Sequence, residues 1–210
     1  MSEYYETRYT FDIGRNKVWK AIAEYLQQYV RNDADCVLDL GAGYCDFINN
    51  IKARERIAVD MNPEASQFCH KDVKFLCASV DDLSLLRENS VDVLFASNLL
   101  EHLEELEIAY AVKEFNRILK QGARLILMQP NYRYAFKEYF DDYTHKKIFT
   151  HISLRDFFQA NGFETIKVHP KFLPFSLKSR LPKSYILTKL YINSFYKPMA
   201  KQMLLVFKKG

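Results

Sequence analysis

Two glycines and a carboxylate further along the chain are the first residues whose types and spacing could do chemistry. Gly41 and Gly43 lie in the turn DLGAGYC, directly after the apolar run CVLDL, and Asp60 follows Gly43 by seventeen residues. Glycine lets the backbone approach a ligand closely, and the start of the next helix offers unpaired N–H groups. A carboxylate at the end of the next apolar run can accept both hydroxyls of a ribose. The pattern predicts a nucleoside-binding turn.

Asp46 bears on the choice of ligand. The dinucleotide fingerprint GxGxxG needs a third glycine at that position, and a carboxylate beside a pyrophosphate is unfavourable. A nucleoside without phosphates is therefore favoured, and a nicotinamide-dependent (NAD) oxidoreductase stays as an alternative. Structural alternatives also stay open, because the glycines could form only a sharp turn and because Asp39 or Asp60 could cap a helix.

His145 is the candidate general base. It lies in YFDDYTHKKIFT, within a loop of about twenty residues that holds Asp141, Asp142 and Tyr143, and long loops in compact domains are often functional. A histidine beside carboxylates can take a proton from an acceptor hydroxyl. The alternative is a surface loop whose acids pair with the two lysines that follow. His102, in SNLLEHL, is expected to pack or hydrogen-bond rather than to act as a base.

Alternating segments would position these residues. Short apolar runs predict strands, and apolar residues at helical spacing predict helices. The expected strands are 36–40, 56–60, 73–78, 91–97, 123–131 (ended by Pro130), 163–170 and 202–209; the expected helices are 15–31, 46–54, one starting at Pro63, 100–120 stopped by Gly122, and one from Thr150 or Ser153 to Asn161-Gly162. The last two strands are expected to lack an ordinary helix between them. The alternation predicts an α/β fold, a doubly wound and mostly parallel sheet with helices on both faces. Such sheets bind ligands at the carboxyl ends of their strands.

The 210 residues suit one domain with an N-terminal helical cover (1–32), a core sheet (33–169 and 200–210) and an insert (170–199). Hydrophobic residues make up 49%, and no apolar run approaches about 18 residues, so a disordered chain and a membrane-spanning helix are excluded. The start lacks the layout of a signal peptide. The four cysteines form no CxxC pair, so a reducing cytoplasm without a zinc site is expected. The N-terminal segment is expected to fold over the ligand cleft, or to pad the core, through Tyr4, Tyr5, Arg8, Tyr9 and Phe11.

Charge is distributed unevenly along the chain. Residues 131–210 hold 15 Lys or Arg and five Asp or Glu, whereas residues 1–130 hold 15 and 21. The insert interleaves basic residues with the apolar side chains of Phe172, Phe175, Tyr185, Ile186, Leu190 and Phe195. This pattern suits an anionic membrane surface. A lid over a phosphorylated acceptor, a dimer contact and a packed helical lid with a solvated basic face are alternatives. Nucleic acid is not an expected partner, because no tight basic cluster is present, and no oligomeric state is predicted.

In order and spacing, these motifs resemble those of the class I S-adenosylmethionine-dependent methyltransferases. VLDLGAGYCDF is similar to their glycine-rich first motif, Asp60 falls on the ribose-binding acid, and CASVDDL falls on the segment that borders the adenine. VDVLFASNLLEHL and KEFNRILKQGARLILMQPN resemble the motifs that follow. The resemblance covers residues 33–131 well and the last two strands by position.

The resemblance implies a seven-stranded sheet whose last strand is antiparallel, and S-adenosyl-L-methionine as the cofactor. The chain departs from the family pattern at Cys45, where a third glycine is usual, and at Ser79, where an acid is usual. The Ser79 hydroxyl, the Val80 amide or Asp81 would then serve the adenine. The residues that the resemblance assigns to the cofactor are Asp39, Gly41, Ala42, Gly43, Asp60, Met61, Ser79, Val80, Asp81, Ser97, Asn98 and His102.

The implied activity is transfer of a methyl group to a small-molecule acceptor. A hydroxyl of a sugar or of a lipid-linked glycan is the expected target, because O-methyltransferases that this chain resembles often carry an Asp-x-Thr-His stretch like the one at His145. No metal is expected, since a sulfonium already activates the methyl group and the protein mainly positions the reactants. The alternative is a non-catalytic binding module that docks on a membrane or a partner. The expected location is the cytoplasm, or the inner face of the membrane.

Overall fold

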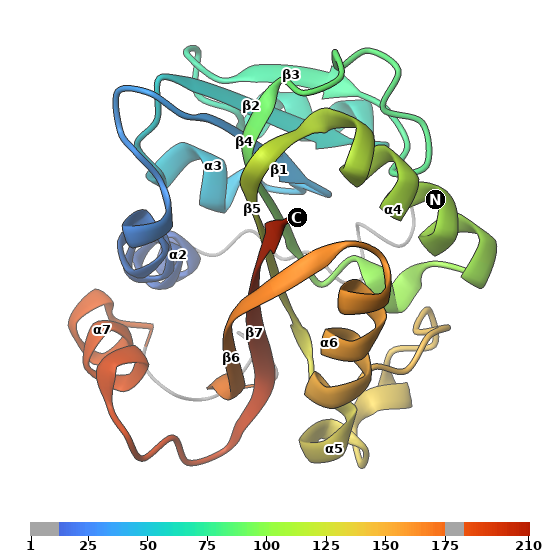
Figure 1. Cartoon of the computed structure of the whole chain (residues 1–210). Coiled ribbons are helices and arrows are strands. Elements are labelled where there is room, and N and C mark those ends of the chain that lie inside the picture. The colour runs from blue at the N-terminus through green and yellow to red at the C-terminus, as the bar shows by residue number, and fades with distance from the viewer. Residues whose placement is uncertain (1–12, 175–182) are drawn as a thin grey trace.

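The structure of the chain, a computed structural model, describes residues 13–174 and 183–210. Its strands and helices alternate along most of the chain (Figure 1). The strands are β1 (Cys36–Leu40), β2 (Glu55–Asp60), β3 (Lys74–Cys77), β4 (Val91–Ser97), β5 (Leu119–Pro130), β6 (Phe163–Pro174) and β7 (Ala200–Lys209). The α-helices are α2 (Ile13–Leu26), α3 (Asp46–Asn50), α4 (Glu105–Ile118), α5 (Tyr132–Ala135), α6 (His151–Ala160) and α7 (Tyr185–Asn193). Short 3₁₀ turns are η1 (Gln27–Tyr29), η2 (Pro63–Phe68), η3 (Leu100–His102) and η4 (Tyr139–Asp141).

The seven strands form one sheet in the order β3-β2-β1-β4-β5-β7-β6. Strands β1 to β5 pair in parallel, and β7 lies antiparallel between β5 and β6. The predicted doubly wound sheet with an antiparallel last strand is therefore confirmed. The order reverses between β1 and β4, and sheets of this type bind ligands at the carboxyl ends of the strands beside such a reversal.

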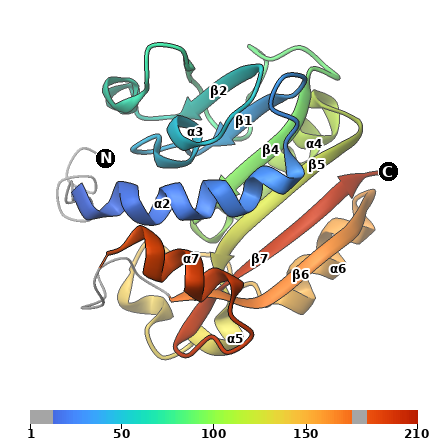
Figure 2. The same ribbon diagram turned by 90° about the vertical axis from the view of Figure 1, so that its left-hand side faces the viewer.

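Helices cover both faces of the sheet, because the central strands are apolar on both sides. The core on one face includes Phe115 of α4 and Phe158 of α6. The core on the other face includes Ile22 of α2, Phe47 of α3 and Ile192 of α7. Figure 2 shows α2 lying across its face of the sheet, with its first turn at the edge where the parallel strands end. Among the described residues, no helix has both the length and the apolar character that crossing a bilayer requires.

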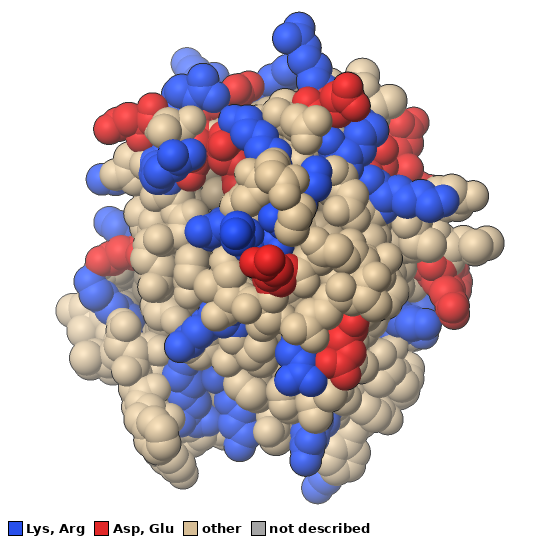
Figure 3. Space-filling view, viewed as in Figure 1, with Lys and Arg blue, Asp and Glu red and all other residues tan. Residues whose placement is uncertain are grey.

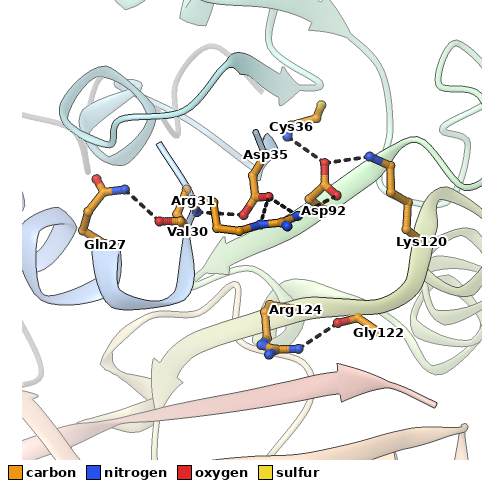
Figure 4. A network of polar contacts seen from close by, with 9 residues as sticks. All are labelled: Gln27, Val30, Arg31, Asp35, Cys36, Asp92, Lys120, Gly122 and Arg124. Atoms are coloured by element: carbon orange, nitrogen blue, oxygen red, sulfur yellow. Dashed lines mark hydrogen bonds and ion pairs between the residues drawn. The ribbon is translucent and has the colours of Figure 1, made fainter. Parts of the chain in front are cut away.

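A polar network fastens the opposite edge of the sheet, where β1, β4 and β5 begin (Figure 4). The Asp92 carboxylate accepts hydrogen bonds from the Cys36 amide at 2.9 Å and from the Lys120 ammonium at 2.8 Å. The buried Asp35 carboxylate pairs with the Arg31 guanidinium at 2.7 Å. These groups neutralise one another locally, so this edge has a structural role.

The helix predicted over 100–120 is wrong at both ends. The first three residues form η3, and α4 starts only at Glu105, because Glu104 and Glu107 form a capping box that begins a new helix. At its other end α4 stops at Ile118 and passes directly into β5. Gly122 lies inside β5 with φ +74°, where the pairing with β4 shifts register, so this glycine serves a bulge and not a helix end.

Other predicted elements differ in length or type. The helix predicted from residue 46 to 54 ends at Asn50, and the one starting at Pro63 is the 3₁₀ turn η2. The expected lack of an ordinary helix before the last strand is wrong, since α7 lies there, capped by Ser184 and packed on α2.

β6 extends to Pro174 and includes the first part of the predicted insert, so Phe172 is buried in the core. Phe175 and the N-terminal Tyr4, Tyr5, Arg8, Tyr9 and Phe11 lie outside the described residues.

Candidate functional site

The glycine-rich turn joins β1 to α3 at the carboxyl edge of the sheet. The amides of Gly41 and Ala42 donate to the Val59 carbonyl of β2 at 2.8 and 3.1 Å. Gly41 has φ +70°, and a Cβ there would lie 3.1 Å from Leu99 Cδ1. Gly43 also has positive φ, +50°. The turn therefore requires glycine for its conformation and, at Gly41, for the close contact with the segment after β4.

Cys45 stands where a third glycine was expected. It adopts the left-handed conformation with φ 55° and is the N-cap residue of α3. A side chain in that conformation costs about 1–2 kcal/mol relative to the right-handed one. The Cys45 sulfur is buried, 2.8 Å from the Cys69 sulfur of the segment after η2. This contact fastens the glycine-rich turn to the neighbouring connection.

Asp60 ends β2 and is fixed by backbone amides. Its carboxylate accepts from the Gly43 amide at 2.7 Å and from the Asn62 amide at 2.9 Å. The alternative that Asp60 caps the helix starting at Pro63 is wrong, because Asn62 caps η2 by accepting from the Glu64 amide at 3.1 Å. A carboxylate is an acceptor-only group with about four lone-pair sites, so its chemistry suits the hydroxyls of a ribose.

Asp39 lies beneath the glycine-rich turn and is 3% exposed. Burial raises the pKa of its carboxyl well above the ordinary value, and the Ile48 amide, which donates to it, opposes that rise in pKa. Because Ile48 lies in the first turn of α3, this hydrogen bond confirms the alternative that Asp39 caps that helix, although Cys45 is the N-cap residue by its backbone position. A cationic group of a ligand nearby would favour the ionised form of this carboxyl.

Arg15 and Tyr44 make contacts at the glycine-rich turn that the sequence did not reveal. The Arg15 guanidinium pairs with the Asp46 carboxylate and lies 5.1 Å from the centre of the Tyr44 ring. These contacts place the start of α2 against the glycine-rich turn, as Figure 2 shows for the ribbon. Nothing in the spacing of a lone arginine near the start of a helix points to this partner.

The segment after β3 lies beside Asp60 at the carboxyl edge of the sheet. Cys77 pairs with Asp60 in the sheet, and the Ala78 amide donates to the Asp60 carbonyl at 3.2 Å. The Ser79 hydroxyl donates to the Asp81 carboxylate, and both side chains are exposed. The Val80 side chain packs in the core, so only its backbone could meet a ligand. Met61 follows Asp60 and is 55% exposed.

At the end of β4, Ser97 and Asn98 face different surroundings. The Ser97 hydroxyl is buried and has no hydrogen-bond partner among the described residues. Asn98 has φ 50°, and its amide oxygen accepts from the Gln202 side chain of β7 at 3.0 Å. A buried hydroxyl without a partner at a ligand-binding edge indicates a group that a ligand would satisfy.

Glu101, His102 and His145 form a compact cluster next to this strand end. The rings of His102 and His145 have centroids 4.9 Å apart, and His145 is only 9% exposed. The His145 Nδ1 donates to the Tyr139 carbonyl at 2.6 Å. The sequence shows no link between the two histidines and no sign of the third member, Glu101, which is fully buried. An acid in a predicted amphipathic helix carries no signal of burial.

Burial dominates the electrostatics of the cluster. Desolvation raises the pKa of Glu101 to about 8, and Asp142 raises it further. Desolvation lowers the pKa of His102 to about 4, with the neighbouring His145 in the same direction. Both groups are therefore driven towards their neutral forms.

The predicted alternative of a plain surface loop at His145 is wrong. The lysines that follow His145 pair with Glu104 at 3.2 Å and Glu105 at 3.3 Å, not with acids of the loop. Their backbone amides both donate to the Glu101 carbonyl, at 2.7 and 3.1 Å. The loop is thus fastened to η3, and it carries His145 into the interior.

A family model and a curated relative match this chain. A family model described as a methyltransferase domain matches residues 38–127. An uncharacterised protein of Methanocaldococcus jannaschii is 29% identical over 194 residues, which cover 91% of this chain and 81% of that one.

Solved structures share the fold. A structure of a SAM-dependent methyltransferase, possible histamine N-methyltransferase, from Thermotoga maritima has a TM-score of 0.74 at 19% identity and covers 100% of this chain and 96% of that one. A SAM-dependent methyltransferase from Archaeoglobus fulgidus has a TM-score of 0.68 at 19% identity, with 92% and 94% of the two chains covered. At these identities, the structures support the fold and the family model supports the domain type.

Proposed function

Since this chain belongs to the class I S-adenosylmethionine-dependent methyltransferases, we propose that it methylates a hydroxyl group of a small-molecule acceptor at the carboxyl edge of its sheet. Sugars and lipid-linked glycans are the first acceptors to test. The observation that supports a hydroxyl acceptor is the buried cluster at His145, directly after the end of β4. Methyltransferase activity is thereby favoured over the alternatives of a nicotinamide oxidoreductase and a non-catalytic module.

The residues at this edge fit the cofactor. The glycine-rich turn passes close to Leu99, so closely that a Cβ at Gly41 would press on that side chain. The Asp60 carboxylate points towards the same turn and accepts from the Gly43 amide. We assign the ribose hydroxyls to Asp60, the adenine to Met61 and the segment 79–81, and the amino group of the methionyl part to Asp39. The cofactor, when bound, supplies a methyl group that its sulfonium already activates.

On the acceptor side the protein orients a hydroxyl and accommodates the loss of its proton. The hydrogen bond from the His145 Nδ1 to the Tyr139 carbonyl fixes the tautomer whose Nε2 is basic. The role of His145 as the base that takes the proton stays a prediction.

We also propose that the protein approaches an anionic lipid surface through α7 and the segment after it. This α7 surface presents large apolar side chains to solvent, namely Ile186, Leu187, Leu190, Phe195, Tyr196 and Met199. No acidic residue follows Glu164 in the chain. In the lower part of Figure 3, basic side chains predominate, whereas both signs mix in the upper part. Apolar side chains on a basic background suit the headgroup region of such a membrane.

The function is tested by calorimetry with S-adenosylhomocysteine and with NAD. We expect the wild-type chain to bind only the former. Asp60→Ala removes a charged acceptor of hydrogen bonds, so the affinity for S-adenosylhomocysteine should fall about 10- to 100-fold. Asp60→Asn keeps the shape of the side chain, so it should lower this affinity less. The exposed Asp33→Ala should leave the affinity unchanged.

Failure of the folded wild-type chain to bind S-adenosylhomocysteine would overturn the proposed function. If binding is established, a panel of hydroxyl and amine acceptors of similar size tests the acceptor. Methyl transfer to amines alone would contradict the hydroxyl proposal and leave the cofactor assignment in place.

A further inference from the structure

The side chains of Glu101, His102 and His145 can each offer one ligand atom, and these three atoms lie within 4.8 Å of one another. We propose that this cluster holds a divalent transition-metal ion that binds the acceptor hydroxyl. The proposal rests on the proposed function and adds to it the means by which the hydroxyl is held and activated. Methyl transfer itself is expected to need no metal, because the methyl group is already activated, but the ion proposed here acts on the acceptor.

Glu101 is the first support for an ion. Its side chain is fully buried, and neither carboxylate oxygen has a hydrogen-bond partner among the described residues. A buried carboxylate without compensation is costly, and a cation bound between Glu101 and the two histidines would provide that compensation.

The surroundings of the two histidines are the second support. Nδ1 of His145 donates to the Tyr139 carbonyl at 2.6 Å. Nδ1 of His102 lies 2.9 Å from the Thr144 hydroxyl, which itself donates to the Asp142 carboxylate at 2.6 Å and therefore accepts from His102. Metal-binding histidines usually donate the second ring nitrogen to a carbonyl or to another acceptor in this way. The pattern assigns Nε2 of both rings to the ion.

The backbone holds the two contributing segments together. Glu101 and His102 belong to η3, and the amides of Lys146 and Lys147 donate to the Glu101 carbonyl. Leu99, two residues before Glu101, lies against Gly41 of the cofactor turn. The cluster therefore lies beside the edge where the methyl group is expected, and the partly exposed His102 gives it a side towards solvent.

The ligand set indicates which ions fit. Two imidazoles and one carboxylate suit Mn²⁺, Fe²⁺ or Zn²⁺ better than Mg²⁺, which prefers oxygen ligands. Three protein ligands would leave coordination positions for an acceptor hydroxyl, whose pKa would fall on binding. The hydroxyl proton would pass to solvent, the oxygen electron pair would form the bond to the methyl carbon, and the carbon–sulfur pair would return to the cofactor sulfur.

Metal titration of the full chain tests this inference. After treatment with a chelator and desalting, the wild-type protein is titrated with MnCl₂, ZnCl₂ and MgCl₂ by calorimetry, and its thermal unfolding is followed with and without each salt. We expect one Mn²⁺ or Zn²⁺ per chain, weaker Mg²⁺ binding, and a rise in unfolding temperature with the bound ion.

Two variants and a control locate the site. Glu101→Gln keeps the side-chain shape and replaces a carboxyl group that can ionise and bind a cation by a neutral amide, so it should fold, yet it should lower Mn²⁺ affinity at least about tenfold. His145→Ala should do the same, whereas the exposed His70→Ala should bind Mn²⁺ like the wild type. Absence of saturable binding by the folded wild type, or unchanged Mn²⁺ affinity in Glu101→Gln, would overturn the proposal.

S-adenosylhomocysteine calorimetry on the same samples separates this inference from the proposed function. Binding of that compound without any metal binding leaves the methyltransferase function in place and overturns the metal site. In that case turnover should survive the chelator, as a direct base role for His145 requires. Loss of turnover on chelation, with recovery on adding Mn²⁺, supports the site.

Discussion

Ser97 and Glu101 have buried polar atoms without partners among the described residues, and both lie just after β4 or at its end. Such atoms are expensive unless a ligand or ion completes them. The same chain has a comparable hydroxyl at Thr165, far from the carboxyl edge, on β6. The effects of removing a buried hydroxyl can therefore be compared inside the site, at Ser97, and outside it, at Thr165.

Ser97→Ala should separate stability from binding. Removing a buried hydroxyl without a partner should leave the free energy of unfolding of the ligand-free chain unchanged or raise it slightly. If the hydroxyl meets the cofactor, affinity for S-adenosylhomocysteine should fall about two- to tenfold. Urea unfolding and calorimetry measure the two quantities. Unchanged affinity would remove Ser97 from the cofactor assignment.

At the scale of elements, two threonines predict opposite effects of one substitution. Thr150 caps α6 by accepting from the Ser153 amide at 3.1 Å, so Thr150→Val should lower the free energy of unfolding by about 1 kcal/mol. The Thr165 hydroxyl has no partner among the described residues, so Thr165→Val should raise it by up to about 1 kcal/mol. Urea unfolding checks both, and effects of the same sign on the free energy of unfolding would contradict this prediction.

Thr165→Val should also leave S-adenosylhomocysteine affinity unchanged, which makes it the control for Ser97→Ala.

His169 joins β6 to α2 and predicts a dependence of stability on pH. Its Nε2 lies 2.9 Å from the Tyr25 hydroxyl, and desolvation, with Lys197 and Lys167 nearby, lowers its pKa to about 4. Between about pH 6.5 and 4 the unfolded chain binds the proton more readily than the folded one. The contribution of His169 to stability is therefore present above pH 6.5 and is lost as the pH falls towards 4.

His169→Gln tests this sign. The difference in free energy of unfolding between wild type and variant should decrease as the pH falls from 7 to about 4.5. The exposed His70→Gln is the matched control for replacing a histidine by glutamine elsewhere in the chain. A difference that stays constant for His169→Gln would show that the ring titrates alike in both states.

At the scale of the whole molecule, the α7 surface predicts selective binding to anionic lipid. The wild-type chain should sediment with vesicles that contain phosphatidylglycerol, less so at high salt, and not with phosphatidylcholine alone. The double change Ile186→Ser and Leu190→Ser should weaken this binding. Leu85→Ser with Leu106→Ser, also exposed but elsewhere, is the control. Equal binding by both double variants would contradict a role for this surface.

The sequence by itself determined the sheet, because its elements follow from local patterns. Apolar runs such as CVLDL specify buried strands, and Gly41 and Asp60 mark the edge of the sheet through their spacing alone. The local signals failed where elements compete, since the capping box at Glu104 divides the predicted helix and Gly122 serves a bulge. A glycine or a periodic pattern does not determine which neighbouring strand the segment will pair with.

Only the tertiary structure decided what the side chains of the site touch. Glu101 and His102 lie more than forty residues before His145 in the chain, yet the loop after β5 returns to η3 and brings all three together. The burial of Glu101 and the contact of Arg15 with Asp46 arise in the same way. The physical reason is that burial and charge pairing depend on packing between distant segments, whereas periodicity and turn chemistry are properties of adjacent residues.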